Sequence, residues 1–103
     1  AIDLDRQKYI VLRSHNSEMN EKYARILRDS FVSMAKAQNI LVVKTVPGMA
    51  MAAAAALDAL QVDGIVGCIA GDDTIMCAIR TEKETDAVME KLHRLTGDKR
   101  VND

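Results

Sequence analysis

The sequence is poor in aromatic residues, with two Tyr, one Phe and no Trp among its 103 residues. Without large rings, a core has to be built from Ile, Val, Leu, Met and Ala. A chain of this length forms one domain that can bury a modest core. We therefore expect a small domain whose packing depends on aliphatic side chains.

Cysteine and histidine are also scarce, and they do not form a catalytic or metal-binding pattern. Cys68 and Cys77 both fall inside predicted strands, whereas a zinc site or a secreted disulfide scaffold requires clustered ligands. His15 and His93 lie among polar and charged residues, without a paired Ser or Cys nucleophile. The pattern indicates two reduced core thiols in a cytoplasmic protein, and it predicts no enzyme, no cofactor and no metal.

The sequence has neither a membrane span nor a strongly basic character. Its longest apolar run, Met49–Leu57, is too short to cross a bilayer. The formal net charge of −1 argues against direct binding of nucleic acid by this chain. Only seven charged side chains fall within residues 31–81, which indicates that this central part forms a core or an interface. We expect no membrane partner.

Two strand pairs, each followed by a helix, are predicted in the central and C-terminal parts of the chain. Residues 38–39 and 71–73 are of types that favour turns within each pair. Thr81 and Glu84 have the spacing of a capping box at the start of the last helix. The order ββαββα predicts an α/β (α+β) two-layer sandwich, in which a four-stranded, mainly antiparallel sheet has helices on one face. The predicted strands are 31–37, 40–45, 65–70 and 74–80, and the predicted helices are 17–27, 47–60 and 81–96.

The predicted helix over residues 47–60 is apolar all round, with Pro47 suited to its first turn. A domain of this size cannot surround such a helix, so we expect one side to pack on the sheet and the other on a partner subunit. The strands at 65–70 and 74–80 lack polar alternation, which predicts that both of their faces are buried. Helices would cover one face and other chains would cover the second. The pattern predicts a homo-oligomer.

Three aspartates stand out in this apolar region. Asp58 lies near the C-terminal end of its helix, where it opposes the helix dipole and favours a cationic partner. Asp72 and Asp73 lie at the tip of the second hairpin, where they form either a solvated turn or a site for a cation. Carboxylates hold a guanidinium through paired hydrogen bonds, and a helix start near Pro47 can receive a carboxylate. The pattern suits a basic amino acid better than Mg²⁺ or Ca²⁺, which require more oxygen ligands.

Three stretches of the central part of the chain occur in a specific order and spacing: KTVPG at residues 44–48, ALDAL at 56–60 and GCIAGDDTI at 67–75. Together they resemble the C-terminal domain of bacterial arginine repressors, and the resemblance covers about residues 28–96. The RQKYIVL stretch further upstream resembles the last strand of the family's winged-helix domain. The implied parts of the chain are the end of a winged-helix DNA-binding domain at 1–13, a linker with a short helix at 14–27, and an oligomerisation and arginine-binding domain at 28–103.

The resemblance implies a transcriptional repressor of arginine metabolism genes that assembles as a hexamer of two stacked trimers. L-Arginine would be the corepressor, would bind at the interface between trimers, and would tighten the hexamer. Operator DNA would be bound only through the winged-helix domain. The implied ligand contacts are Asp72, Asp73, Asp58, Thr74, Met51 and Ala50.

Two positions depart from the family's usual pattern. Met51 stands where the family usually carries a glutamine that contacts the ligand, and a thioether cannot donate the amide's hydrogen bond. Cys68 replaces a common threonine at a strand position. Three alternatives remain open: a constitutive oligomerisation module with no effector, a module for another amino acid such as citrulline, and a small enzyme. The last lacks a nucleophile or His partner beside its paired aspartates.

Overall fold

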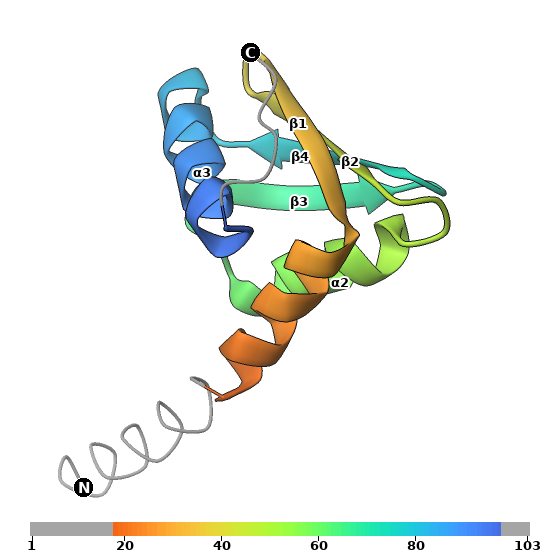
Figure 1. The fold of residues 1–103 in the computed structure, drawn as a ribbon. Coiled ribbons are helices and arrows are strands. Elements are labelled where there is room, and N and C mark those ends of the chain that lie inside the picture. The colour runs from red at the N-terminus through yellow and green to blue at the C-terminus, as the bar shows by residue number, and fades with distance from the viewer. Residues whose placement is uncertain (1–17, 98–103) are drawn as a thin grey trace, which may run out of the picture.

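The computed structural model describes residues 18–97 of the chain (Figure 1). Residues 1–13, predicted to end a winged-helix domain, lie outside the described residues. A helical segment at residues 18–30 precedes two strand pairs, each followed by a helix. The elements are β1 (Phe31–Ala37), β2 (Ile40–Thr45), α2 (Ala50–Leu60), β3 (Ile65–Ala70), β4 (Thr74–Ile79) and α3 (Glu82–Leu95).

The four strands form one antiparallel sheet in the order β1-β2-β4-β3. Because β4 pairs with both β3 and β2, the two hairpins share a single sheet, and β1 and β3 form its edges. The predicted α+β sandwich is confirmed, and each strand predicted within residues 18–97 agrees with the observed one to within one residue. The strand predicted within residues 1–13 lies outside the described residues. None of the helices within residues 18–97 is long and apolar enough to span a membrane.

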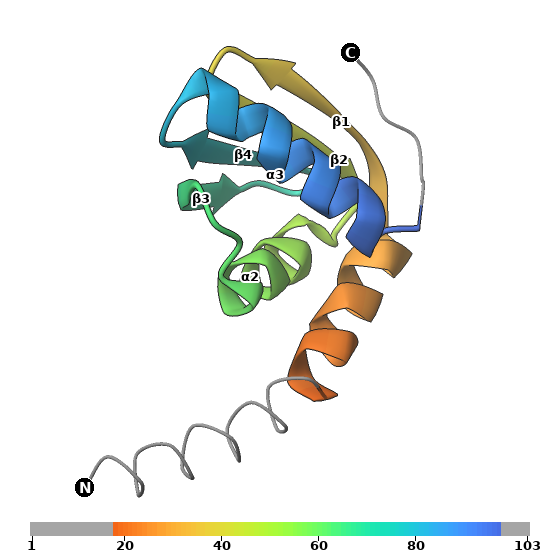
Figure 2. The same cartoon turned by 90° about the vertical axis from the view of Figure 1, so that its left-hand side faces the viewer.

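Helices α2 and α3 cover the same face of the sheet (Figure 2). Inward residues face each other across β2 and β4, where Leu41 pairs with Cys77 and Val43 pairs with Ile75, and all four are at most 1% exposed. Burying an aliphatic side chain of this size contributes about 1.5–3 kcal/mol, so these layers stabilise the fold without aromatic rings. The helices contribute Ala53, Ala56, Leu57, Val88 and Leu92 to the same core.

The helical segment at residues 18–30 belongs to this core. Its Leu27 side chain is 2% exposed, and Ala24 is also buried. The Ser30 hydroxyl donates to the carbonyl of Ile26 at 2.7 Å, and β1 begins at the next residue. The helix therefore extends three residues beyond its predicted end. The division of the chain at residues 13 and 27 stays a prediction.

Helix α2 begins at Ala50, so the prediction that Pro47 lies in its first turn is wrong. Gly48 has φ +84°, a left-handed conformation that favours glycine and interrupts a right-handed helix. The N-cap is Met49, whose side chain has no oxygen to accept a helix N–H. Instead, the N–H groups of Gly48 and Ala50 both donate to the carbonyl of Asp72, at 3.0 and 3.2 Å. The turn between β3 and β4 therefore caps α2.

Helix α3 begins at its predicted capping box. The Oγ1 atom of Thr81 accepts from the N–H of Glu84 at 3.0 Å and donates to the Oε2 atom of Glu84 at 3.0 Å. A salt bridge of 2.7 Å between Lys36 and Asp86 joins β1 to α3. The hydrogen bond to the Asp86 carboxylate raises the pKa of Lys36. The capping box thus starts α3, and the salt bridge connects its first turns to β1.

Candidate ligand-binding site

The turn at residues 71–74 packs against the connection between β2 and α2. It is closed by a hydrogen bond of 2.8 Å from the N–H of Gly71 to the carbonyl of Thr74. The carbonyl of Asp72 accepts from the start of α2, and the carbonyl of Asp73 accepts from the N–H of Thr45 at 2.8 Å. The structure thus brings together the two motifs that the sequence analysis singled out. Because the backbone makes these contacts, the Asp72 and Asp73 side chains stay exposed.

A short chain of hydrogen bonds orients one of these carboxylates. The hydroxyl of Thr74 donates to Oδ1 of Asp73 at 2.9 Å and accepts from Nζ of Lys44 at 2.9 Å. Lys44 faces Thr74 because the two residues are paired across β2 and β4. Lys44 is not among the residues predicted for the site, since only the pairing of β2 with β4 brings it there.

Ala50 and Met51, the two predicted contacts at the start of α2, differ in exposure. Ala50 is fully buried and its N–H already donates to Asp72, so in this chain neither its methyl group nor its amide is available to a ligand. Met51 is 71% exposed. The first N–H groups of an α-helix have no acceptor within the helix, which leaves those of Met51 and Ala52 for an anion.

Asp58 lies apart from the turn within one chain. It is exposed, and it follows Ala50 by about 12 Å along α2. Asp58 is instead a neighbour of Cys68 on β3. The hydrogen bond with Cys77 lowers the pKa of Cys68, whereas the negative charge of Asp58 raises it. Across residues 18–97, no group of three or more His, Cys, Asp or Glu side chains could hold a metal ion. A single chain therefore does not gather the three aspartates around one ligand.

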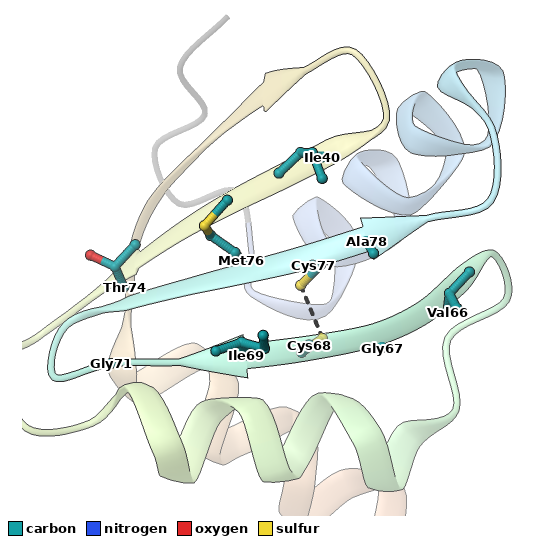
Figure 3. A pocket seen from close by; sticks show the side chains of 10 residues that line it. All are labelled: Ile40, Val66, Gly67, Cys68, Ile69, Gly71, Thr74, Met76, Cys77 and Ala78. Atoms are coloured by element: carbon teal, nitrogen blue, oxygen red, sulfur yellow. Dashed lines mark hydrogen bonds between the residues drawn. The ribbon is translucent and has the colours of Figure 1, made fainter.

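The face of the sheet opposite the helices is open and apolar (Figure 3). Val66, Ile69 and Met76 on this outer face are 69%, 79% and 53% exposed. Gly71 and Thr74 lie at the border of the same depression, so the outer face continues into the turn. Contiguous exposed apolar residues are typical of a surface that binds another protein. The prediction that other chains bury this face stays a prediction.

The chemistry of the turn and the helix start is that of half a binding site. Two exposed carboxylates can accept hydrogen bonds from a cation such as a guanidinium. The adjacent start of α2 offers free N–H groups and the positive end of the helix dipole to an anion. A ligand with both a basic group and a carboxylate matches this combination of donors and acceptors.

Comparison with known proteins gives the family of the chain. A family model described as "Arginine repressor, C-terminal domain" matches residues 27–94. The matched range contains the whole sheet, α2 and the turn at residues 71–74. It also begins within the helical segment that packs into the core.

Several curated proteins named "Arginine repressor" are similar to the chain. The protein from Lachnoclostridium phytofermentans is 70% identical over 95 residues, which are 92% of this chain and 62% of the relative. The one from Lachnospira eligens is 52% identical over 95 residues, with 92% and 63% covered. The one from Alkaliphilus metalliredigens is 43% identical over 89 residues, with 86% and 60% covered.

The chain spans less than two thirds of the length of these relatives. The family model, by contrast, matches well over half of the chain itself. On the strength of that match and of these similarities, the chain belongs to the arginine repressor family.

Proposed function

We propose that this domain senses L-arginine and assembles the oligomer of a transcriptional repressor of arginine metabolism genes. The observation that carries the proposal is the turn at residues 71–74, which caps α2 through its backbone while both of its carboxylates remain exposed. Membership of the family supports arginine as the effector. Operator DNA is bound by a winged-helix domain upstream of this one, and L-arginine is the corepressor.

Asp72 and Asp73 hold the guanidinium of arginine. A well-formed hydrogen bond to a charged group contributes roughly 1.5–3 kcal/mol, so two carboxylates supply most of the affinity for the basic end. The Thr74 hydroxyl, itself bonded by Lys44, donates to one oxygen of Asp73, which leaves the other oxygen of Asp73 for the ligand. The α-carboxylate of arginine is received by the N–H groups of Met51 and Ala52 at the start of α2.

A complete site requires more than one subunit. The turn at residues 71–74 (the acidic turn) and the start of α2 are adjacent in one chain, whereas the guanidinium and the carboxylate lie at opposite ends of arginine. Each ligand is therefore held at its basic end by one subunit and at its acidic end by another. Asp58, which lies away from the turn in its own chain, contacts a ligand held by a neighbouring copy.

The surfaces for assembly are the outer face of the sheet and the exposed side of α2. The outer face presents large apolar side chains, and the exposed side of α2 consists mainly of alanine. Small residues permit close approach of another chain, and burial of the apolar face stabilises the assembly. Trimers and hexamers built on these two surfaces place the acidic turn at the boundary between trimers.

Arginine tightens the hexamer by mass action. A ligand that binds only the hexamer stabilises it by about 2.7 kcal/mol per site at a hundredfold excess over its Kd. Assembly in turn raises the affinity for arginine by the same factor, because coupling between binding events is reciprocal.

Titration calorimetry with L-arginine and L-citrulline tests the proposal. Citrulline replaces the guanidinium with a neutral group of similar shape, so we expect it to bind at least tenfold more weakly than arginine. Met51 supports a second candidate, an oligomerisation module without an effector, because its thioether cannot donate a hydrogen bond to a ligand. That candidate predicts no heat of binding with either amino acid.

A further inference from the structure

The two cysteines of the chain face each other across the β3–β4 hairpin. Cys68 and Cys77 are paired in the antiparallel register, and both are free thiols. Their Sγ atoms lie 3.1 Å apart and share a hydrogen bond (Figure 3). Directly opposed residues of an antiparallel pair have Cα atoms about 4.5–5.5 Å apart, which is within the 4.4–6.8 Å that a disulfide spans. The strands can therefore be linked without a change of register.

The two thiols are not equivalent. Cys77 is fully buried beneath the helices, whereas Cys68 is half-buried on β3, an edge strand of the sheet. The hydrogen bond between the thiols lowers the pKa of Cys68, and burial and the Asp58 carboxylate oppose this effect. The same hydrogen bond and burial raise the pKa of Cys77. Cys68 is thus the thiol that ionises and meets a reagent first, and Cys77 stays protonated beside it.

We propose that Cys68 and Cys77 are a peroxide-responsive pair that forms a reversible disulfide within one chain. The Cys68 thiolate attacks one oxygen of hydrogen peroxide, the O–O bond breaks, and a Cys68 sulfenic acid and hydroxide result. The Cys77 sulfur then attacks the Cys68 sulfur, the S–O bond breaks, and water leaves with the proton of Cys77. The hydroxide takes up the proton that Cys68 released when it ionised. The two sulfurs thus lose two electrons in total, and the peroxide is reduced to two molecules of water.

The ring closed by this disulfide contains the turn at residues 71–74. Oxidation therefore links β3 and β4, the two strands that flank this turn. The link lies close to Asp58, whose carboxylate acts on Cys68. A small dithiol reverses the reaction by thiol–disulfide exchange and becomes oxidised itself. The oxidation site stands on the strand register, the Sγ–Sγ contact and the burial of the two thiols, so it can be tested independently of arginine binding.

Peptide mapping of the peroxide-treated protein tests the proposal. The protein is treated with hydrogen peroxide, and one portion is then reduced with dithiothreitol. Both portions are unfolded, so that the buried Cys77 is accessible, and their free thiols are alkylated. Residues 45–80 contain no Lys or Arg before Arg80, so trypsin leaves both cysteines in one peptide. A protease that cleaves at aspartate separates them at Asp72 and Asp73. We expect two fragments joined by a Cys68–Cys77 disulfide, neither of them alkylated, and recovery of both thiols after reduction.

Two variants separate the roles of the thiols. In Cys77→Ala, we expect a Cys68 sulfenic acid that dimedone traps, because the resolving thiol is absent. In Cys68→Ser, we expect Cys77 to remain a free thiol, because it is buried. Oxidation of a methionine-containing peptide added to the same solution serves as the sign that the peroxide is active. The proposal is overturned if both cysteines of the unsubstituted protein stay alkylatable after unfolding once this peptide is oxidised, or if Cys68 links only to a second chain.

Discussion

The two hairpins of the sheet end in short turns that use their side chains in opposite ways. In the β1–β2 turn, the side-chain NH2 group of Asn39 donates to the backbone carbonyl of Ile79 at 3.1 Å. The backbone carbonyl of Asn39 accepts from the Ile79 N–H at 2.9 Å. In the β3–β4 turn, the backbone carbonyls of Asp72 and Asp73 make the contacts with the rest of the chain. The first turn uses a side chain to hold the fold, whereas the second leaves two charged side chains available to a ligand.

The two hairpins also differ in the apolar side chains that their strands expose. β1 presents the small Ala35 and Ala37 and one larger apolar residue, Val32, which is 45% exposed. The second hairpin presents Val66, Ile69 and Met76, exposed by 69%, 79% and 53%. Nothing within residues 18–97 covers the apolar side chains of the second hairpin, and exposed apolar patches are typical of surfaces that bind another protein. The comparison supports the proposal that the first hairpin completes the domain and that the second binds ligands and other copies.

The largest expected effect comes from a charge on the outer face of the second hairpin. We expect Ile69→Lys to dissociate the oligomer into smaller species, because burial of an unpaired charge costs several kcal/mol. Sedimentation velocity at matched concentrations measures the change. Ala37→Lys, which places the same charge on β1, serves as the control and should leave the oligomer intact. An unchanged sedimentation profile for Ile69→Lys would show that this face is not an interface.

The next effect concerns the carboxylates of the second turn. We expect Asp72→Asn and Asp73→Asn each to weaken L-arginine binding by roughly ten- to hundredfold, since each removes a charged hydrogen bond worth about 1.5–3 kcal/mol. The domain should stay folded, because the backbone of the turn makes its structural contacts. Calorimetry measures the affinity, and Asp63→Asn in the turn before β3 provides a matched control. Equal affinities for Asp72→Asn and Asp63→Asn would remove Asp72 from the site.

A substitution in the β1–β2 turn should lower the stability of the domain and leave its arginine affinity unchanged. Asn39→Ala removes the hydrogen bond to Ile79 and is expected to lower the free energy of unfolding by about 1 kcal/mol. Arginine affinity should not change in the folded variant. Urea unfolding followed by circular dichroism gives the stability, and calorimetry gives the affinity. A selective loss of arginine binding, with unchanged stability, would contradict the division of roles between the turns.

A smaller effect is expected where a side chain only orients a carboxylate. Thr74→Val keeps a β-branched residue on β4 but removes the hydroxyl that donates to Asp73. We expect arginine affinity to fall by no more than about fivefold, because hydrogen bonds among exposed charged groups contribute roughly 0.2–1 kcal/mol. A loss as large as that of Asp73→Asn, measured by the same calorimetry, would mean that the Thr74 hydroxyl contacts arginine itself.

Much of the fold could be predicted because local signals in the sequence agree with the tertiary structure. Residue types that favour turns separate the strands of each hairpin, and Thr81 starts α3 as the N-cap. The start of α2 could not be predicted in this way. It depends on the positive φ of Gly48 and on the Asp72 carbonyl, which arrives from a turn distant in the sequence.

The candidate site was predictable in part for a similar reason. Asp72 and Asp73 are conspicuous as charges within an apolar hairpin, and the structure leaves both exposed. Lys44 reaches the site only because β2 pairs with β4, which no local pattern specifies. Asp58 is separated from the turn by most of the length of α2, so the contact proposed for it requires a second chain.

The most direct test of the account is sedimentation of the domain over a dilution series, with and without millimolar L-arginine. The account predicts that arginine holds the domain in hexamers at concentrations where the unliganded protein falls to trimers, and that L-citrulline does not. Oligomers of the same size at every dilution, with or without arginine, would contradict it.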